Sequence, residues 1–296
     1  MKKIISLAII AILSLSLVAC GSKNNNEENT SKEVVSDEAS QDTSESNEAS
    51  QDEKGAVAKI KEKGELVLAT SPDYPPYEFK IVEDGEEKTL GFDIAIAEEI
   101  AKDMGVSLRI SELDFNGLLV ALNANKADMV MAGMTPDEER IKAVDFSDIY
   151  YVAEQAIMVP AKNKDSIKTL EDLKGKKVGV QKGSIQEKIA MKQIEGANIV
   201  PLVKLPSIIL ELSSGNIDAA IVELPVAEGY VKQFSDLAIS DVNVVDEVGG
   251  AAIAVKKGNE DLVLQINSTI ERLIEDGSIE KYVLEANEIV EKMGQK

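Results

Sequence analysis

The stretch MAGMTPDEERIKAVDFSDIYY, residues 131–151, begins with the end of an apolar segment that leads into a glycine turn. Thr135, Pro136 and Glu138 have the residue types preferred at the N-cap and at the first and third positions of a helix. The spacing therefore predicts a short helix that begins at Thr135, with Arg140 one turn further on. The free N–H groups and the positive dipole end of such a helix start favour an anion.

Arg140 stands out because only three of the 32 basic residues of the chain are arginines. The planar guanidinium binds a carboxylate through two parallel hydrogen bonds, which the ammonium group of lysine does not do. Gly133, Thr135 and Arg140 are therefore candidates for binding an α-carboxylate. The alternative is an ordinary capped helix that carries a surface arginine.

The composition excludes several classes of chemistry. The chain has 296 residues, 44% of them hydrophobic, no histidine and a formal charge of −21. The length allows two domains. The absence of histidine excludes His-based triads and His metal sites, and the single cysteine, Cys20, leaves no disulfide in the rest of the chain. The negative charge argues against nucleic acid and anionic membrane surfaces as partners.

The N-terminal residues are typical of a secretion signal. Residues 1–20 combine two lysines, a short apolar core and small residues before Cys20. Residues 21–55 contain ten acidic residues against three lysines and almost no large apolar side chain. Such a segment cannot bury enough surface to fold, so we expect an acidic, disordered tether.

Strand-like and helix-like segments alternate from Ala56 onward. This order predicts an α/β fold with parallel βαβ units. A strand, a glycine turn and a capped helix recur at Gly183–Glu187, so we expect two similar lobes. The last two helices should cover the first lobe, which makes the chain cross between lobes twice. We place one lobe at 56–153 with 247–296, and the other at 154–246. The expected strands are 65–70, 106–110, 128–131, 155–160, 177–180, 198–202, 218–222 and 248–255, and the expected helices are 91–105, 116–124, 186–194, 207–213, 260–276 and 277–287, with a further helix opening at 223.

Several polar or aromatic segments follow strands, and ligands of open α/β sheets lie beyond the carboxyl ends of strands. Arg140 supplies a cation there, and Glu223 supplies an anion at a different strand end. This pair suits a zwitterion such as a free amino acid, with Tyr74 and Phe115 as apolar faces. Glu223 as a helix cap and the aromatic residues as core packing are the alternatives. Neither glycine turn matches a nucleotide-binding motif.

From about Gly64 to Ala286 the chain resembles the polar amino-acid family of bacterial solute-binding proteins, the extracytoplasmic receptors of ABC importers. The resemblance implies a two-lobed, type II periplasmic-binding-protein fold, in which each lobe is a mixed, mostly parallel sheet flanked by helices and joined by two hinge crossings. The matching segments are GELVLATSPDYPPYEF (64–79), 91–105, LDFNGLLVAL (113–122), 127–151, LKGKKVGVQKGSIQE (173–187) and NIDAAIVELPVA (216–227).

The resemblance also implies roles for single residues. Tyr74 and Phe115 would hold the ligand between their rings, and Arg140 would bind its α-carboxylate. Glu223 stands where the family usually has an aspartate that binds the α-ammonium, and its longer side chain needs more room. The complete set of expected ligand-binding residues is Ser71, Asp73, Tyr74, Phe115, Gly133, Met134, Thr135, Arg140, Gln181, Ser184, Ile185, Gln186 and Glu223.

The same resemblance also indicates which kind of ligand to expect. Ser71 stands where relatives that bind long polar side chains often carry an acid, and Asp73 follows two residues later. A basic ligand could use Asp73, whereas glutamine would suit Ser71 and Gln181. An acidic ligand is disfavoured because no spare cation stands out apart from Lys182. We expect a basic or neutral polar L-amino acid such as arginine, lysine or glutamine.

The end of the signal resembles the lipobox of bacterial lipoproteins, which implies cleavage before Cys20 and a lipid on its sulfur. The chain is then expected to be anchored at the outer face of the cell membrane, as in Gram-positive bacteria, and to deliver its ligand to an ABC permease. We expect no cofactor, metal or catalytic residue. A dehydratase-like enzyme that uses Glu223 or Asp73, a surface adhesin and a sensor module are the alternatives. The sensor would need a transmembrane segment after the binding domain, and the sequence predicts none.

Overall fold

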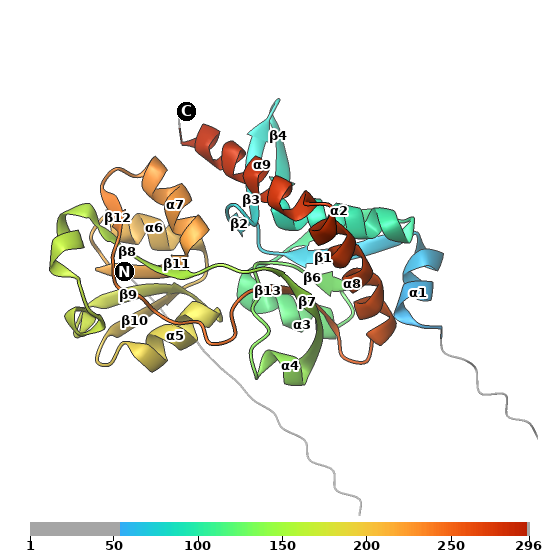
Figure 1. Ribbon diagram of the computed structural model, residues 1–296, viewed down its shortest axis with the longest axis horizontal. Helices are drawn as coiled ribbons and strands as arrows, with labels where there is room; N and C mark the ends of the chain where they lie inside the picture. The colour runs from blue at the N-terminus through green and yellow to red at the C-terminus, as the bar shows by residue number, and fades with distance from the viewer. Residues whose placement is uncertain (1–53, 295–296) are drawn as a thin grey trace, which may run out of the picture. The chain divides into compact units, whose positions relative to one another are not determined.

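The computed structural model describes residues 54–294 (Figure 1). The predicted signal, Cys20 and nearly all of the predicted tether lie outside the described residues. The described chain forms two five-stranded sheets and one three-stranded sheet. Within this part of the chain, no helix combines the length and apolar character needed to cross a membrane.

The first sheet has the strand order β5-β1-β6-β13-β7. β1 pairs in parallel with β5 and β6, whereas β13 runs antiparallel to both of its neighbours. We call this sheet and the helices packed on it the first lobe. Its strands are β1 (Glu65–Thr70), β5 (Ser107–Glu112), β6 (Met129–Val130), β7 (Val144–Tyr151) and β13 (Ala251–Lys256).

The second sheet repeats this plan in the order β10-β9-β11-β8-β12, and with its helices it forms the second lobe. β9 pairs in parallel with β10 and β11, and β8 runs antiparallel to β11 and β12. The chain enters this sheet between β7 and β8 and leaves it between β12 and β13, so the two predicted crossings are present. Its strands are β8 (Gln155–Pro160), β9 (Lys177–Gln181), β10 (Asn198–Leu202), β11 (Ala219–Glu223) and β12 (Leu237–Ile239).

The helices that cover the sheets are amphipathic. In α2, Phe92, Ile96 and Ile100 are fully buried at a spacing of four residues, and Gly105 ends the helix at a φ of 72°. Pro206 lies in the first turn of α6, where a missing N–H costs nothing. The helices of the first lobe are α1 (Ala56–Lys63), α2 (Phe92–Met104), α3 (Leu118–Asn123), α4 (Arg140–Ala143) and α8 (Glu260–Glu275), and those of the second are α5 (Ile185–Gln193), α6 (Leu205–Ser213) and α7 (Leu224–Gln233).

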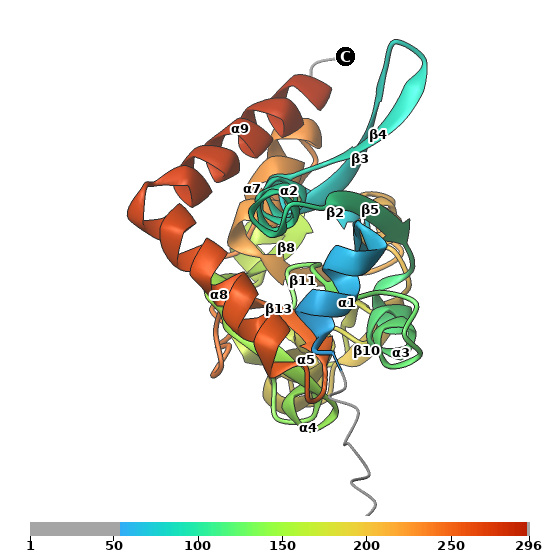
Figure 2. The same ribbon diagram turned by 90° about the vertical axis from the view of Figure 1, so that its right-hand side faces the viewer.

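The last helix, α9 (Ser278–Met293), lies against both α2 of the first lobe and α7 of the second (Figures 1 and 2). Gly229 of α7 permits the close approach, since an added Cβ would meet Val290 Cγ1 at 3.2 Å. Lys232 of α7 forms an ion pair with Glu291 of α9. The helix therefore touches the second lobe as well as the first, which the sequence pattern did not indicate.

The structure corrects the helix predicted to begin at Thr135. Residues 134–137 are not helical, and α4 begins only at Arg140. The carboxylate of Asp137 accepts the backbone N–H groups of Glu139 and Arg140, at 2.9 and 3.0 Å. Asp137, rather than Thr135, thus satisfies the N–H groups that precede the helix, because its carboxylate can accept two bonds at once.

Short elements complete the fold. A hairpin that the sequence analysis did not anticipate forms from β3 (Glu78–Glu83) and β4 (Glu86–Leu90), and β2 (Asp73–Tyr74) pairs with β3. Short 3₁₀ helices lie at Phe115–Gly117, Ala161–Ser166 and Leu170–Leu173.

Candidate functional site

A small cavity of about 10 Å³, room for about one water molecule, lies between the two lobes. Its walls come from segments that follow β1, β5, β6 and β9, at the carboxyl ends of these strands. Nine of the thirteen residues expected from the sequence line it, together with Ala132. The lining residues are Tyr74, Phe115, Ala132, Gly133, Thr135, Arg140, Gln181, Ser184, Ile185 and Gln186.

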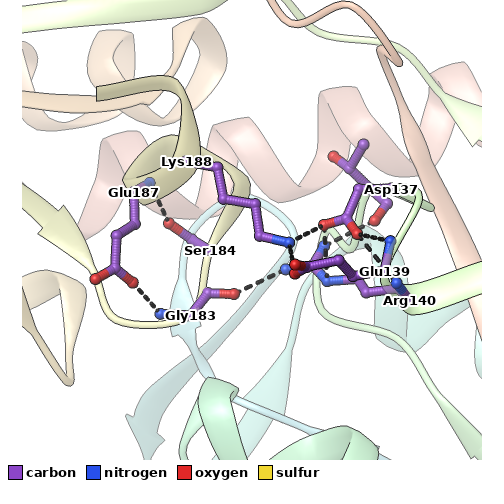
Figure 3. A network of polar contacts seen from close by, with 8 residues as sticks. Asp137, Glu139, Arg140, Gly183, Ser184, Glu187 and Lys188 are labelled. Atoms are coloured by element: carbon purple, nitrogen blue, oxygen red, sulfur yellow. Dashed lines mark hydrogen bonds and ion pairs between the residues drawn. The ribbon is translucent and has the colours of Figure 1, made fainter. Parts of the chain in front are cut away.

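Arg140 places a buried cation in this cavity. Its Nη1 donates to the carbonyl of Thr135 at 2.7 Å, and its Nη2 donates to the carbonyl of Gly183 in the second lobe at 2.9 Å (Figure 3). Its Cζ lies 5.4 Å from the centroid of the Phe115 ring, a distance typical of a cation–π contact. Burial lowers the pKa of Arg140 and Asp137 raises it, and a guanidinium stays charged at neutral pH. The cavity therefore contains a fixed positive charge, which is the group that a carboxylate pairs with.

Asp137 holds Arg140 in place. Its Oδ2 lies 3.5 Å from Arg140 Nε, and its Oδ1 accepts the Arg140 backbone N–H. Burial alone would raise the pKa of Asp137, but the Arg140 N–H and guanidinium and the Lys188 ammonium lower it, so that the net pKa lies below its usual range. An ionised Asp137 thus fixes the orientation of the guanidinium.

Thr135 and Gly133 lie on the loop before Arg140. The Thr135 hydroxyl is buried and has no hydrogen-bond partner, so it can bind a ligand at no cost to the fold. Gly133 has a φ of 54°, a conformation that favours glycine, and its N–H donates to Asp93 Oδ2 at 3.1 Å. Because that N–H is already bonded, Gly133 shapes the wall more than it offers a donor.

Residues after β9 form the opposite wall. Ser184 caps α5 by accepting the Glu187 N–H at 3.2 Å, as predicted, but the Glu187 carboxylate accepts the N–H of Gly183 instead of that of Ser184 (Figure 3). The Ser184 N–H donates to Gln181 O at 3.2 Å. Gln186 Nε2 donates to Gln155 Oε1 at 3.0 Å. This wall is polar and neutral.

Glu223 ends β11 and is buried, but it does not line the cavity. Its backbone N–H donates to the Tyr74 hydroxyl at 3.2 Å, which joins the two lobes. Its Oε2 and the Tyr77 hydroxyl lack hydrogen-bond partners. Burial raises the pKa of Glu223 to about 8, because the charged form loses its hydration. The carboxyl group is therefore mostly neutral at pH 7.

Ser71, Asp73 and Met134 also lie outside the small cavity. Met134 is a core residue, 1% exposed. Ser71 and Asp73 line a neighbouring open hollow of about 590 Å³. Asp73 accepts bonds from Ser71 Oγ, from Gln181 Nε2 and from the N–H of Leu205 at the start of α6. Gln181 lines the small cavity, so Asp73 lies directly behind its wall.

Sequence reasoning missed the residues that support this site. Asp93 is fully buried, and its carboxylate accepts the Tyr150 hydroxyl at 2.7 Å and the Gly133 N–H. Gln155 links Gln186 to Asp246, at 3.0 and 3.5 Å. Within residues 54–294, no group of three or more acids or cysteines is arranged to hold a metal ion. In the sequence, the only indication of these supporting residues was Asp93, an acidic residue within the apolar pattern of a predicted helix.

Comparison with known proteins gives the family. Residues 66–285 match the model of bacterial extracellular solute-binding proteins, family 3. The chain belongs to this family, whose members include amino-acid-binding proteins of ABC transporters.

Among its relatives, the arginine-binding extracellular protein ArtP of Bacillus subtilis is 35% identical over 95% of this chain and 96% of that protein. The L-cystine-binding protein TcyJ of Escherichia coli is 33% identical over 77% and 84% of the two chains. A crystal structure of the amino acid ABC transporter substrate-binding protein AbpA of Streptococcus pneumoniae, bound to L-arginine, superposes with a TM-score of 0.77. It is 38% identical, and the match covers 79% of this chain and 98% of that one. The structural likeness confirms the two-lobed fold.

Proposed function

We propose that this protein captures a free L-amino acid between its two lobes and delivers it to the permease of an ABC importer. The observation that carries the proposal is the buried guanidinium of Arg140 in a cavity lined by residues of both lobes. A ligand carboxylate would take the remaining guanidinium N–H groups and the unpartnered Thr135 hydroxyl. Contacts on both lobes give the ligand a higher affinity for the closed arrangement than for an open one.

The magnitudes require both ends of the ligand to be held. A micromolar dissociation constant corresponds to about −8 kcal/mol. A hydrogen bond to a charged group contributes about 1.5–3 kcal/mol, so the carboxylate contacts alone do not suffice. We infer that Glu223, which is buried beside Tyr74 and Tyr77, receives the α-ammonium. For a ligand in the cavity to reach Glu223, the rings of Tyr74 and Tyr77 have to move.

The ligand that we propose is a basic or neutral polar amino acid, with L-arginine first. Asp73 lies behind Gln181, where the side chain of a long ligand would end. Burial raises the pKa of Asp73, and a cationic side chain would reverse that shift. The neutral wall of Gln181 and Gln186 suits an amide as well. The relative named for arginine supports the cationic choice.

We also propose an extracytoplasmic location, with a lipid on Cys20 that anchors the chain to the outer face of the membrane. The N-terminal sequence pattern supports this proposal. The lobe boundaries at 153/154 and 246/247 remain our proposal for the hinge segments. They coincide with the intervals between β7 and β8 and between β12 and β13.

Replacement of Arg140 tests the proposal. Calorimetric titration of the wild type with L-arginine should show binding, and Arg140→Ala should abolish it, a loss of at least about 3 kcal/mol because a charged pair is removed. Arg109→Ala is the matched control, since Arg109 is half-exposed and pairs with Glu65 away from the cavity. Undiminished affinity in Arg140→Ala would refute the assignment.

A further inference from the structure

Lys188 extends from the second lobe to the first without lining the cavity. It lies on α5, and its Nζ contacts Asp137 Oδ2 at 3.1 Å and the carboxylate of Glu139 (Figure 3). Its side chain is 41% exposed, whereas that of Asp137 is 7% exposed. The contact thus joins a partly exposed cation to a buried anion across the interval between the lobes.

Asp137 connects this contact to Arg140. The same carboxylate oxygen, Oδ2, lies 3.1 Å from Lys188 Nζ and 3.5 Å from Arg140 Nε. Arg140 in turn donates to the Gly183 carbonyl, five residues before Lys188. Two cations therefore cross between the lobes in opposite directions, and one carboxylate bonds to both. Charges alternate along this chain of contacts, so that each contact supports the next.

We propose that Lys188 is a positioning residue for ligand binding, which acts through Asp137 to hold Arg140 toward the cavity and to favour closure of the lobes. The predicted effect of Lys188 on affinity rests on the proposed function, because it requires that the protein binds an amino acid. Because Lys188 does not touch the cavity, it favours the closed arrangement equally for every ligand. Its loss should therefore weaken all ligands by one factor and leave their ranking unchanged.

The effect should lie mainly in the dissociation rate. Opening of the lobes breaks the Lys188–Asp137 contact, whereas ligand entry into the open form precedes its formation. We expect Lys188→Gln to raise the dissociation constant for L-arginine about fivefold, the upper range for a partly exposed ion pair. The association rate should change less than twofold. Lys188→Arg, which keeps the cation, should restore most of the affinity.

The matched control is Lys192→Gln. Lys192 lies one turn further along α5, so its replacement removes the same charge from the same helix. Lys192 pairs with Glu247 instead of Asp137, and the side chains of Lys192 and Glu247 are both more than half exposed. High salt should reduce the affinity of the wild type more steeply than that of Lys188→Gln, because the screened contact is already absent in the variant.

Stopped-flow binding and calorimetry on the purified chain, together with small-angle X-ray scattering without ligand, test the proposal. A faster dissociation rate in Lys188→Gln but not in Lys192→Gln, and a larger radius of gyration of its ligand-free form, would support it. An unchanged dissociation rate in Lys188→Gln, or a Lys188→Arg variant that restores none of the affinity, would overturn it. If the wild type binds no amino acid, the proposed function fails, while the scattering comparison still decides whether Lys188 favours closure.

Discussion

At the scale of single residues, a permanent cation lines the cavity, and a carboxyl group with a raised pKa lies buried outside it. Arg140 remains charged in its buried position, whereas burial raises the pKa of Glu223 from its usual 4.5 to about 8. Sequence reasoning identified both residues and nine of the ten residues that line the cavity. It could not show that Glu223 lies outside the cavity, because burial depends on how Tyr74 and Tyr77 pack over it.

The pKa of Glu223 predicts a pH dependence of stability. Between pH 4.5 and about 8 the native ligand-free protein holds a proton that the unfolded chain has lost, so its stability should fall as pH rises through this window. Glu223→Gln should remove that slope and be the more stable protein at pH 8.5. Urea unfolding at several pH values measures this. The control is Glu138→Gln at an exposed position, and identical slopes in the wild type and Glu223→Gln would contradict the prediction.

At the scale of elements, the sequence predicted long, strongly periodic segments well. α2 ends at its glycine as expected, and β8 and β10 have the predicted bounds. The hairpin β3–β4 was missed because its outer residues are exposed and charged, so no alternating apolar pattern marks it. The helix at Thr135 was misplaced because Thr135 and Asp137 are both good caps, and only the observed hydrogen bonds of Asp137 decide between them.

The cap of α5 gives a prediction at this scale. Ser184→Ala removes the hydroxyl that accepts the Glu187 N–H, so we expect a loss of about 1 kcal/mol in the free energy of unfolding. Denaturant unfolding measures the loss. Ser214→Ala, at an exposed position after α6, should change the stability by no more than a few tenths of that value. Equal losses in the two variants would show that the cap contributes nothing specific.

At the scale of the whole molecule, the two lobes repeat one plan, and the small cavity lies between them. Contacts that cross between the lobes include polar ones in or near the cavity, from Asp73, Tyr74, Arg140 and Lys188, and the packing of α9 on α7. The repeated strand, glycine turn and capped helix predicted the two lobes. The position of α9 was not predictable, because an amphipathic helix shows which face is apolar but not which partner it covers.

The central claim is that Arg140 binds the carboxylate of an amino acid. Its most direct test changes the ligand and leaves the protein unchanged. We expect the purified chain to bind L-arginine in calorimetry and to lose at least about 3 kcal/mol of binding free energy when the ligand is L-argininamide, because the amide cannot form the charged pair with Arg140. L-Glutamine and its α-amide form a second pair for the neutral ligand class. Equal affinity for an amino acid and its α-amide, or no binding of any of the twenty amino acids, would contradict the account.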